Sequence, residues 1–195
     1  MFRKITLAIL GFCLFCSGPG FSTDFRPTPE VDLGRVLIVF FSLTGSTQRL
    51  ARILRLYSEG NLAAIVPSEP YDLESVRSIA KTEITTNYRP PLASPIPTVD
   101  DYDLVIIGAP VWFGDIPPPL AAVLDKCDFL GKPVAVFCTF NGSAGDFLSK
   151  FRENIKNANI ISEGKFSGIT RRNNANLNAI ALSWLKSIAE AFPKQ

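Results

Sequence analysis

The sequence VLIVFFSLTGSTQRLA at residues 36–51 decides the fold of this chain. Its first six residues are apolar and mostly β-branched or aromatic, which is typical of a strand buried on both faces of a sheet. A short polar loop follows, and then apolar residues recur with helical spacing, at Leu50, Ile53, Leu54 and Tyr57. A strand, a loop of small residues and a helix in this order bring free backbone N–H groups to the positive end of a helix dipole. Such a point binds phosphate.

The loop in this stretch carries hydroxyl groups and no charged side chain. Its polar residues are Ser42, Thr44, Gly45, Ser46 and Thr47. It lacks the Lys of a P-loop and has one glycine where a dinucleotide-binding fingerprint has three, so a phosphate here would be held by uncharged donors. The same residues also suit an N-capped helix start without any ligand, because Ser and Thr are good N-caps.

The first 22 residues have the order of a secretory signal peptide. Arg3 and Lys4 precede an apolar run at residues 5–16, and small residues follow it. Because such a run is short for a membrane span, we expect cleavage before Thr23 and a periplasmic or secreted protein. An uncleaved segment that anchors the protein in the membrane is the alternative. We expect residues 23–34 to be a linker and residues 35–195 to form one domain.

Composition excludes several classes of function. The chain of 195 residues has a formal net charge of +2, which falls to zero without residues 1–22. A neutral domain without a basic patch does not bind nucleic acid. The chain has no His, and its Cys and carboxylates show no metal-ligand spacing, so we expect no metal site. Any chemistry must therefore come largely from a bound cofactor.

The four cysteines do not indicate redox chemistry. Cys13 and Cys16 have the spacing of a redox pair, but they lie inside the apolar run of the signal peptide. We expect Cys127 and Cys138 to be two unrelated buried thiols. A disulfide between them in an oxidising compartment is the alternative.

Strands and helices alternate along the rest of the chain. We expect strands at residues 35–41, 61–66, 103–109 and 133–139, and a fifth strand that begins with residues 159–162. We expect helices at 46–58, 73–84, from 117, from 147, and around 177–188. This alternation predicts a parallel sheet with helices on both faces. The Pro-rich segment 87–97 is either a functional loop or a crossover strap. Polar, Gly-containing loops follow the first, third and fourth strands, so they meet at the carboxyl edge, where such sheets bind ligands.

Four motifs together resemble the flavodoxin family, most closely its short-chain flavodoxin-like branch. They are the loop at residues 42–47, the motif GAPVWFGDIP at 108–117, the residues Pro70-Tyr71 with Glu83, Arg89 and Pro90, and the stretch from Gly131-Lys132 to Gly142-Ser143. The resemblance covers residues 35–190. It implies an α/β protein, a three-layer αβα sandwich with a five-stranded parallel sheet of order 2-1-3-4-5, and flavin mononucleotide (FMN) as a non-covalent cofactor.

The resemblance also assigns roles to residues in the three loops. The first loop would hold the FMN phosphate, through Ser42, Thr44, Gly45, Ser46 and Thr47. The second would line the edge of the isoalloxazine ring, with Trp112 or Phe113 stacked on it, and comprises Pro110, Val111, Trp112, Phe113 and Gly114. The third would close the other side of the ring, with Thr139, Asn141, Gly142, Ser143 and Gly145. Asp146 is expected to cap a helix, not to bind a ligand.

Three functions follow from these expectations. The first is an exported FMN-binding protein that carries electrons to a redox partner protein. The second is an FMN-dependent NAD(P)H reductase of quinones or other small electron acceptors, and the third is a binding domain without flavin. Flavodoxins are usually acidic overall, whereas Asp115 is the one acidic residue of the aromatic loop here. The neutral charge therefore weakens the prediction of a low-potential carrier.

Overall fold

The protein is described here by a computed structural model that covers residues 31–193. The predicted signal peptide and most of the predicted linker lie outside this range. The chain is already packed where the description begins, because Val31 and Leu33 are buried against the core. None of the helices between residues 31 and 193 is both long enough and apolar enough to cross a membrane.

Within the described range, five parallel strands form one sheet in the order β2-β1-β3-β4-β5. Their bounds are β1 Val36–Phe40, β2 Asn61–Ala64, β3 Leu104–Pro110, β4 Pro133–Phe140 and β5 Asn159–Ser167. The predicted topology is confirmed. The central strands β1, β3 and β4 are buried almost throughout, as continuous apolar runs in a parallel sheet require.

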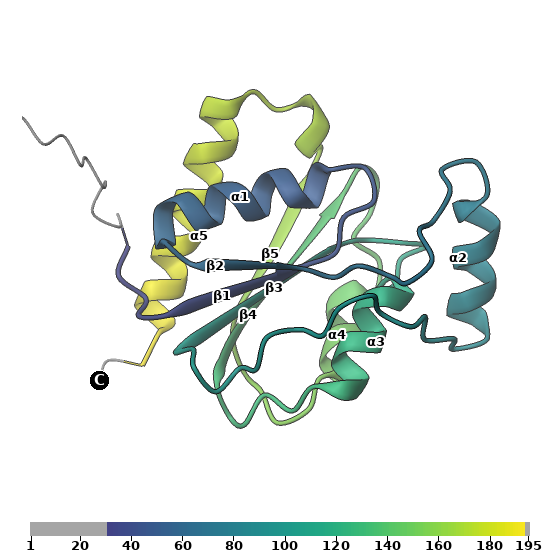
Figure 1. Ribbon diagram of the computed structural model, residues 1–195. Coiled ribbons are helices and arrows are strands. Elements are labelled where there is room, and N and C mark those ends of the chain that lie inside the picture. The colour runs from purple at the N-terminus through teal and green to yellow at the C-terminus, as the bar shows by residue number, and fades with distance from the viewer. Residues whose placement is uncertain (1–30, 194–195) are drawn as a thin grey trace, which may run out of the picture.

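Helices cover both faces of the sheet (Figure 1). Helices α1 (Ser46–Ser58) and α5 (Asn174–Ala191) lie on one face, and α3 (Pro118–Lys126) and α4 (Phe147–Asn154) on the other. Each face buries its own apolar cluster, in which Leu50 and Leu185 represent the first face and Leu120 and Phe151 the second. The predicted three-layer sandwich is therefore confirmed.

Helix α2 (Val76–Thr85) does not belong to either layer. It stands beyond the carboxyl edge of the sheet, apart from the other helices (Figure 1). The predicted helix at residues 73–84 is present, but it begins three residues later, at Val76. Leu73 precedes the helix and is 66% exposed, Ile79 is 40% exposed, and of the helix residues Ala80 is the buried one. The apolar residues of this segment have helical spacing, but α2 packs on neither face of the sheet, so Leu73 and Ile79 stay exposed.

The Pro-rich segment after α2 is a strap. Its start pairs with the chain after β2, because the Ser68 N–H donates to the Pro91 oxygen (2.8 Å) and the Ala93 N–H donates to the Val66 oxygen (2.8 Å). Farther on, Val99 is buried in the core cluster of the α3 and α4 face. Of the two interpretations left open by the sequence, the packing favours the crossover strap.

The ends of the two outer strands were predicted least completely. Strand β2 ends at Ala64 and not at residue 66, and β5 continues to Ser167 although the sequence Glu-Gly-Lys at 163–165 breaks its apolar pattern. Gly164 explains the continuation. A Cβ atom there would lie 2.5 Å from the Phe166 ring and 2.9 Å from the Trp184 ring, so glycine lets these rings pack on the strand.

Candidate functional site

The loop between β1 and α1 has the geometry of a phosphate site. Gly45 precedes the helix with φ of 86°, a left-handed conformation that favours glycine, and the first helical turn contains no acidic residue. Thr44 is exposed at the tip of the loop, whereas Thr47 is buried. An anion at this point therefore meets the positive helix end without any competing carboxylate from α1.

Donors in this loop are free. Within residues 31–193, no atom accepts a hydrogen bond from the backbone N–H groups of Leu43, Thr44 or Gly45. In the same range, the hydroxyls of Ser42, Thr44 and Ser46 have no hydrogen-bond partner either. Backbone and hydroxyl donors that face one helix end and lack acceptors suit the three oxygens of a phosphate monoester. The predicted phosphate residues therefore lie together at this helix end, and their contacts with a phosphate stay predictions.

The second predicted loop is a tight hairpin. Trp112 and Asp115 exchange backbone hydrogen bonds of 3.1 and 2.9 Å, and the two residues between them, Phe113 and Gly114, have φ of 52° and 80°. Positive φ at both central positions is the geometry of a type I′ turn. A bulky aromatic residue in that region is strained, and Phe113 is nonetheless 49% exposed at the tip. The hairpin thus holds an aromatic ring at the surface of the carboxyl edge.

The third predicted loop lies against this hairpin. A Cβ atom on Gly145 would lie 2.4 Å from the Gly114 Cα atom, so two glycines allow the two backbones to touch. The Asp146 N–H donates to the Gly114 oxygen (2.7 Å). Asp146 occupies the N-cap position of α4, as predicted, although its side chain makes no capping hydrogen bond. Asn141, Gly142 and Ser143 are exposed beside this contact.

A buried hydrogen bond joins the first loop to the third. The Thr47 and Thr139 hydroxyl oxygens are 2.8 Å apart, and both side chains are buried. The Val111 N–H donates to the Thr139 carbonyl oxygen (2.9 Å), so the second loop is connected to the third. All three predicted loops therefore form one connected unit at the carboxyl edge. Contacts of the individual residues with a flavin stay predictions.

Trp112 is packed between two other aromatic rings. Its ring centroid lies 5.3 Å from that of Phe41 and 5.2 Å from that of Tyr71, and both contacts are edge-to-face. Such pairs contribute about 0.5–1.5 kcal/mol each beyond their buried area. These two rings were not predicted as site residues. The apolar run at the end of β1 hinted at Phe41 alone, and no local signal placed Tyr71 beside Trp112.

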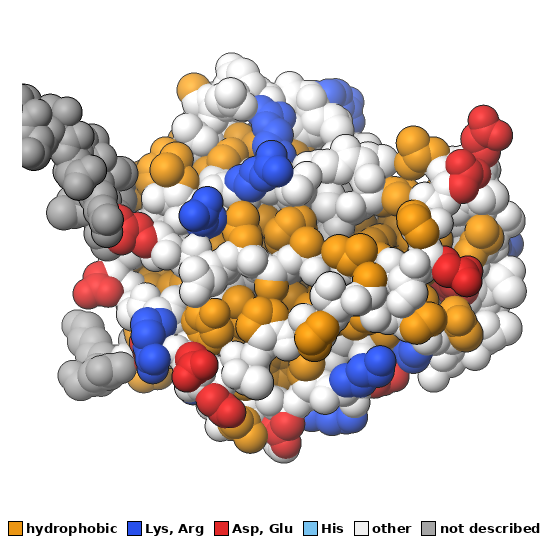
Figure 2. All heavy atoms as spheres, in the orientation of Figure 1, with side chains coloured by type: hydrophobic (Ala, Val, Ile, Leu, Met, Phe, Trp, Pro, Cys, Tyr) orange, Lys and Arg blue, Asp and Glu red, His pale blue; other side chains and the backbone are white. Residues whose placement is uncertain are grey.

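Tyr71 also links the hairpin to α2. Its hydroxyl donates to the Glu83 carboxylate (2.6 Å), and burial together with this bond raises the pKa of Tyr71 well above its ordinary value. Helix α2 is further fixed by the strap after it, where Arg89 pairs with Asp125 (2.8 Å). Figure 2 shows exposed hydrophobic side chains mixed with carboxylates at this end of the molecule. The helix is therefore attached at definite points although it covers no sheet.

An arginine on α1 ties the phosphate loop to the C-terminal part of the chain. The Arg49 guanidinium donates to the carbonyl oxygens of Ile169 (3.1 Å) and Arg172 (2.9 Å) and to the Asn174 side-chain oxygen (2.7 Å). Its N–H donors are engaged by these acceptors, and it lies one turn into the helix that begins at Ser46. Arg49 thus positions the start of α1 against the start of α5.

The two thiols of the described chain are free. Burial raises the pKa of Cys138 to about 11 and also raises the pKa of Cys127. The prediction of two unrelated thiols is confirmed, but only Cys138 is fully buried, whereas Cys127 is partly exposed. Among residues 31–193, no group of three or more His, Cys, Asp or Glu side chains is arranged to hold a metal ion.

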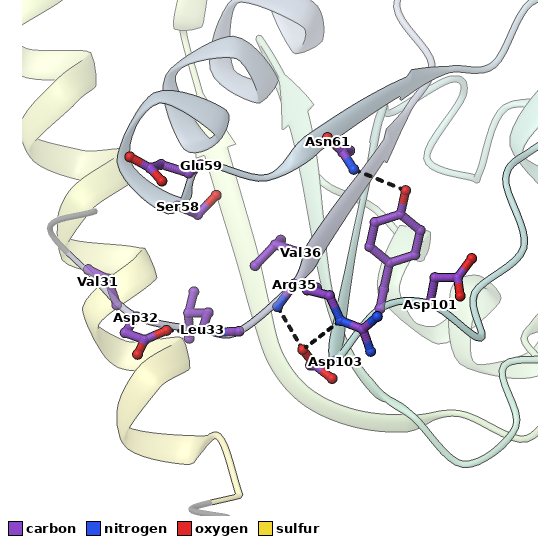
Figure 3. A pocket seen from close by; sticks show the side chains of 12 residues that line it. Val31, Asp32, Leu33, Arg35, Val36, Ser58, Glu59, Asn61, Asp101 and Asp103 are labelled. Carbon is purple, nitrogen blue, oxygen red and sulfur yellow. Dashed lines mark hydrogen bonds and ion pairs between the residues drawn. The ribbon is translucent and has the colours of Figure 1, made fainter. Parts of the chain in front are cut away.

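A cavity lies at the opposite, amino edge of the sheet. It has a volume of about 550 Å³ and lies where the chain enters β1 (Figure 3). Its charged side chains are Asp32, Arg35, Glu59, Asp101 and Asp103. Four carboxylates against one guanidinium disfavour a phosphate, so the cavity does not compete with the β1–α1 loop for this ligand.

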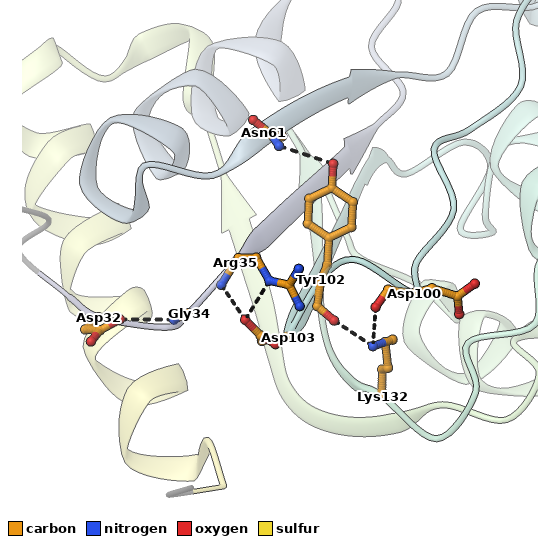
Figure 4. Close-up of polar contacts among 8 residues, drawn as sticks. All are labelled: Asp32, Gly34, Arg35, Asn61, Asp100, Tyr102, Asp103 and Lys132. Atoms are coloured by element: carbon orange, nitrogen blue, oxygen red, sulfur yellow. Dashed lines mark hydrogen bonds and ion pairs between the residues drawn. The ribbon is translucent and has the colours of Figure 1, made fainter.

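Polar contacts in this cavity fix the entry to the sheet (Figure 4). The Asp103 carboxylate accepts from the Arg35 backbone N–H (2.7 Å) and lies 3.4 Å from its Nε atom. These hydrogen bonds lower the pKa of Asp103 below its ordinary range. Lys132 donates to the carbonyl oxygens of Asp100 (3.1 Å) and Tyr102 (2.8 Å). The cluster therefore has a structural role, as a clamp between the starts of β1 and β3.

With this fold and carboxyl-edge site in view, sequence comparison identifies the family. The family model described as flavodoxin matches residues 35–179, which include all three loops of the site. The chain belongs to the flavodoxin family.

Solved structures agree with this assignment. The crystal structure of a flavoprotein in complex with FMN from Lactobacillus acidophilus is 27% identical, with a TM-score of 0.61 over 68% of this chain and 93% of that one. A crystal structure from Bacteroides eggerthii is 29% identical, with a TM-score of 0.64 over 80% of this chain and 98% of that one. The chain thus has relatives among flavoproteins of similar size.

A curated relative adds an enzyme to the comparison. An NAD(P)H dehydrogenase (quinone) from Azorhizobium caulinodans is 30% identical over 99 residues, which are 48% of this chain and 47% of that protein. The chain thus spans about half the length of the curated relative that it matches.

Proposed function

We propose that this protein binds FMN at the carboxyl edge of its sheet and transfers electrons. The single observation that carries the proposal is the β1–α1 loop, where unpaired backbone and hydroxyl donors converge at a helix end without a carboxylate. The FMN complex of the Lactobacillus acidophilus relative supports the choice of cofactor. Bound FMN would accept and release electrons singly or in pairs, which is the chemistry that the protein's own side chains lack.

In this proposal the loops of the chain have separate tasks. Backbone N–H groups at residues 42–47 and the hydroxyls of Ser42, Thr44 and Ser46 bind the phosphate, whereas the Thr47 hydroxyl is bonded to Thr139. The helix dipole adds about 0.3–1 kcal/mol, or more when the anion is partly buried. The hairpin at residues 112–115 and the loop around Gly145 hold each other in place, so they present a rigid wall to the ring of the cofactor. Rigid walls reduce the ordering cost of binding.

We further propose that the protein has one of two electron-transfer roles, that of a carrier or that of a reductase. A carrier would pass electrons to a redox partner protein, whereas a reductase would take them from NAD(P)H and reduce a quinone or another small acceptor. The partial match to an NAD(P)H dehydrogenase (quinone) favours the reductase as the second candidate. Export across a membrane by residues 1–22, to the periplasm or the exterior, remains part of the proposal, with an uncleaved membrane anchor as the alternative.

The test is a visible absorption spectrum of the purified protein, with FMN added if it is colourless. We expect a protein-bound flavin spectrum, and we expect T44E to weaken FMN binding at least tenfold, because a carboxylate at the exposed loop tip repels the phosphate. T98E, at an exposed position directly after the strap, is the matched control and should bind FMN normally. A protein that ignores added FMN would refute the proposal. If the protein does bind FMN, rapid reduction of the bound flavin by NADPH would indicate the reductase, and no reduction would indicate the carrier.

A further inference from the structure

Arg77 lies beside the hairpin at residues 112–115, at the carboxyl edge of the sheet. Its Cζ atom lies 6.0 Å from the centroid of the Phe113 ring, which is the geometry of a cation–π contact. Arg77 belongs to α2 and Phe113 to the hairpin after β3, so the contact joins two elements that are distant in sequence. The displaced position of α2 is what brings the guanidinium to the hairpin.

The charge of Arg77 is not neutralised. None of the ion pairs among residues 31–193 includes it, and its side chain is exposed. Among the same residues, the Arg77 guanidinium also donates no hydrogen bond to a carboxylate or carbonyl oxygen. The guanidinium therefore keeps its five donors for a ligand.

The platform beneath Arg77 is rigid. Phe113 is held in a left-handed conformation by the double hydrogen bond of its hairpin, and the next residue, Gly114, is fixed against Gly145. Helix α2 is fixed in turn by the hydrogen bond between Tyr71 and Glu83. An aromatic face and an unpaired guanidinium are thus presented together, and this combination suits an aromatic molecule that carries an anionic group.

We propose that Arg77 is a specificity-determining residue, which with Phe113 selects electron donors or acceptors that carry a phosphate, sulfonate or carboxylate. This inference rests on the proposed function, because the selected molecule must reach the bound flavin. The shared chemistry has two sources, a small anionic acceptor such as a sulfonated quinone, or the phosphates of a pyridine dinucleotide. Hydrogen bonds to a charged group are strong enough for an effect of about tenfold on a dissociation constant.

The test measures equilibrium binding to the FMN-loaded protein by calorimetry. The probes are 1,4-naphthoquinone-2-sulfonate, the neutral 2-methyl-1,4-naphthoquinone, and NADP⁺. R77Q is compared with K81Q, which removes an exposed cation one turn farther along α2. We expect R77Q to reduce the preference for the anionic over the neutral quinone, or the affinity for NADP⁺, by about tenfold, and K81Q to leave both unchanged.

Each outcome decides the inference. A loss confined to the sulfonate identifies a small acceptor, and a loss confined to NADP⁺ identifies the dinucleotide. Equal losses for the neutral and the anionic quinone, no change in R77Q, or no binding of either anionic probe to the wild type would overturn it. Failure to take up FMN at all is visible in the absorption spectrum beforehand, and that result would instead refute the proposed function. Unchanged FMN affinity in R77Q serves as the control for folding.

Discussion

Replacing Gly145 by Ala should separate the two loops that form the wall of the proposed flavin site. An added Cβ atom would lie 2.4 Å from the Gly114 Cα atom and 2.6 Å from its oxygen. These are backbone atoms, which cannot rotate away as a side chain does. The substitution also requires alanine to adopt φ of 51°, in the left-handed region.

The magnitude follows from these two effects. A left-handed conformation costs about 1–2 kcal/mol for a residue with a Cβ atom. Overpacking against a fixed neighbour costs about 1–3 kcal/mol. We therefore expect G145A to lower the free energy of unfolding by about 2–5 kcal/mol, a large part of the roughly 5–15 kcal/mol of a typical domain. The FMN affinity should fall as well, because relief of the clash displaces the hairpin.

Urea denaturation and FMN titration measure the two effects. Gly142 provides the control, because it lies in the same loop, does not have a positive φ, and has open space within 4 Å of the point where an alanine Cβ atom would lie. We expect G142A to change the free energy of unfolding by less than about 1 kcal/mol. The reasoning is refuted if G145A keeps its stability and its FMN affinity, or if G142A is as damaging as G145A.

Three further predictions concern hydrogen bonds. T47V leaves the buried Thr139 hydroxyl without its partner, so it should lower the free energy of unfolding by about 1–3 kcal/mol, and in urea denaturation T47V/T139V should lose less than the sum of the single variants. Because the pKa of Tyr71 is raised above its ordinary value of 10.0, the free energy of unfolding should fall as the pH rises above that value. The free energy of unfolding of Y71F should fall less over the same pH range, and equal pH dependence in the two proteins would contradict this. Because the pKa of Asp103 lies below its ordinary value of 3.8, its stabilisation is present above that pH and is lost below it, so acid titration of D103N should show a shallower decline than that of the wild type. An identical acid transition would show that the carboxylate has no such role.

The sequence was sufficient for the central part of the fold. Strands β1 and β3 were predicted to within one residue at each end, because both are continuous apolar runs that no helix of a surface layer would have. The start of α1 at Ser46 was predicted correctly from the loop that precedes it. Since parallel strands end at one edge, the meeting of the three loops also followed from their order.

The periphery could not be predicted because it depends on tertiary contacts. Helical spacing around Leu73 and Ile79 predicted a helix, yet nothing local shows that α3 and α4 already fill the neighbouring face of the sheet, so that this helix lies outside both layers. The packing of Trp112 between Phe41 and Tyr71 has the same origin. Arg77 gave no signal at all, because its role depends on the hairpin beneath it.

The hydrogen bonds of Arg49 have a consequence for the order of events during biosynthesis. Its acceptors at Ile169, Arg172 and Asn174 lie 120 or more residues later in the chain. A growing polypeptide that lacks this last portion has nothing to hold the guanidinium, and so its phosphate loop is not yet fixed against α5. Cofactor uptake would therefore follow completion of the chain, after the C-terminal helix has docked.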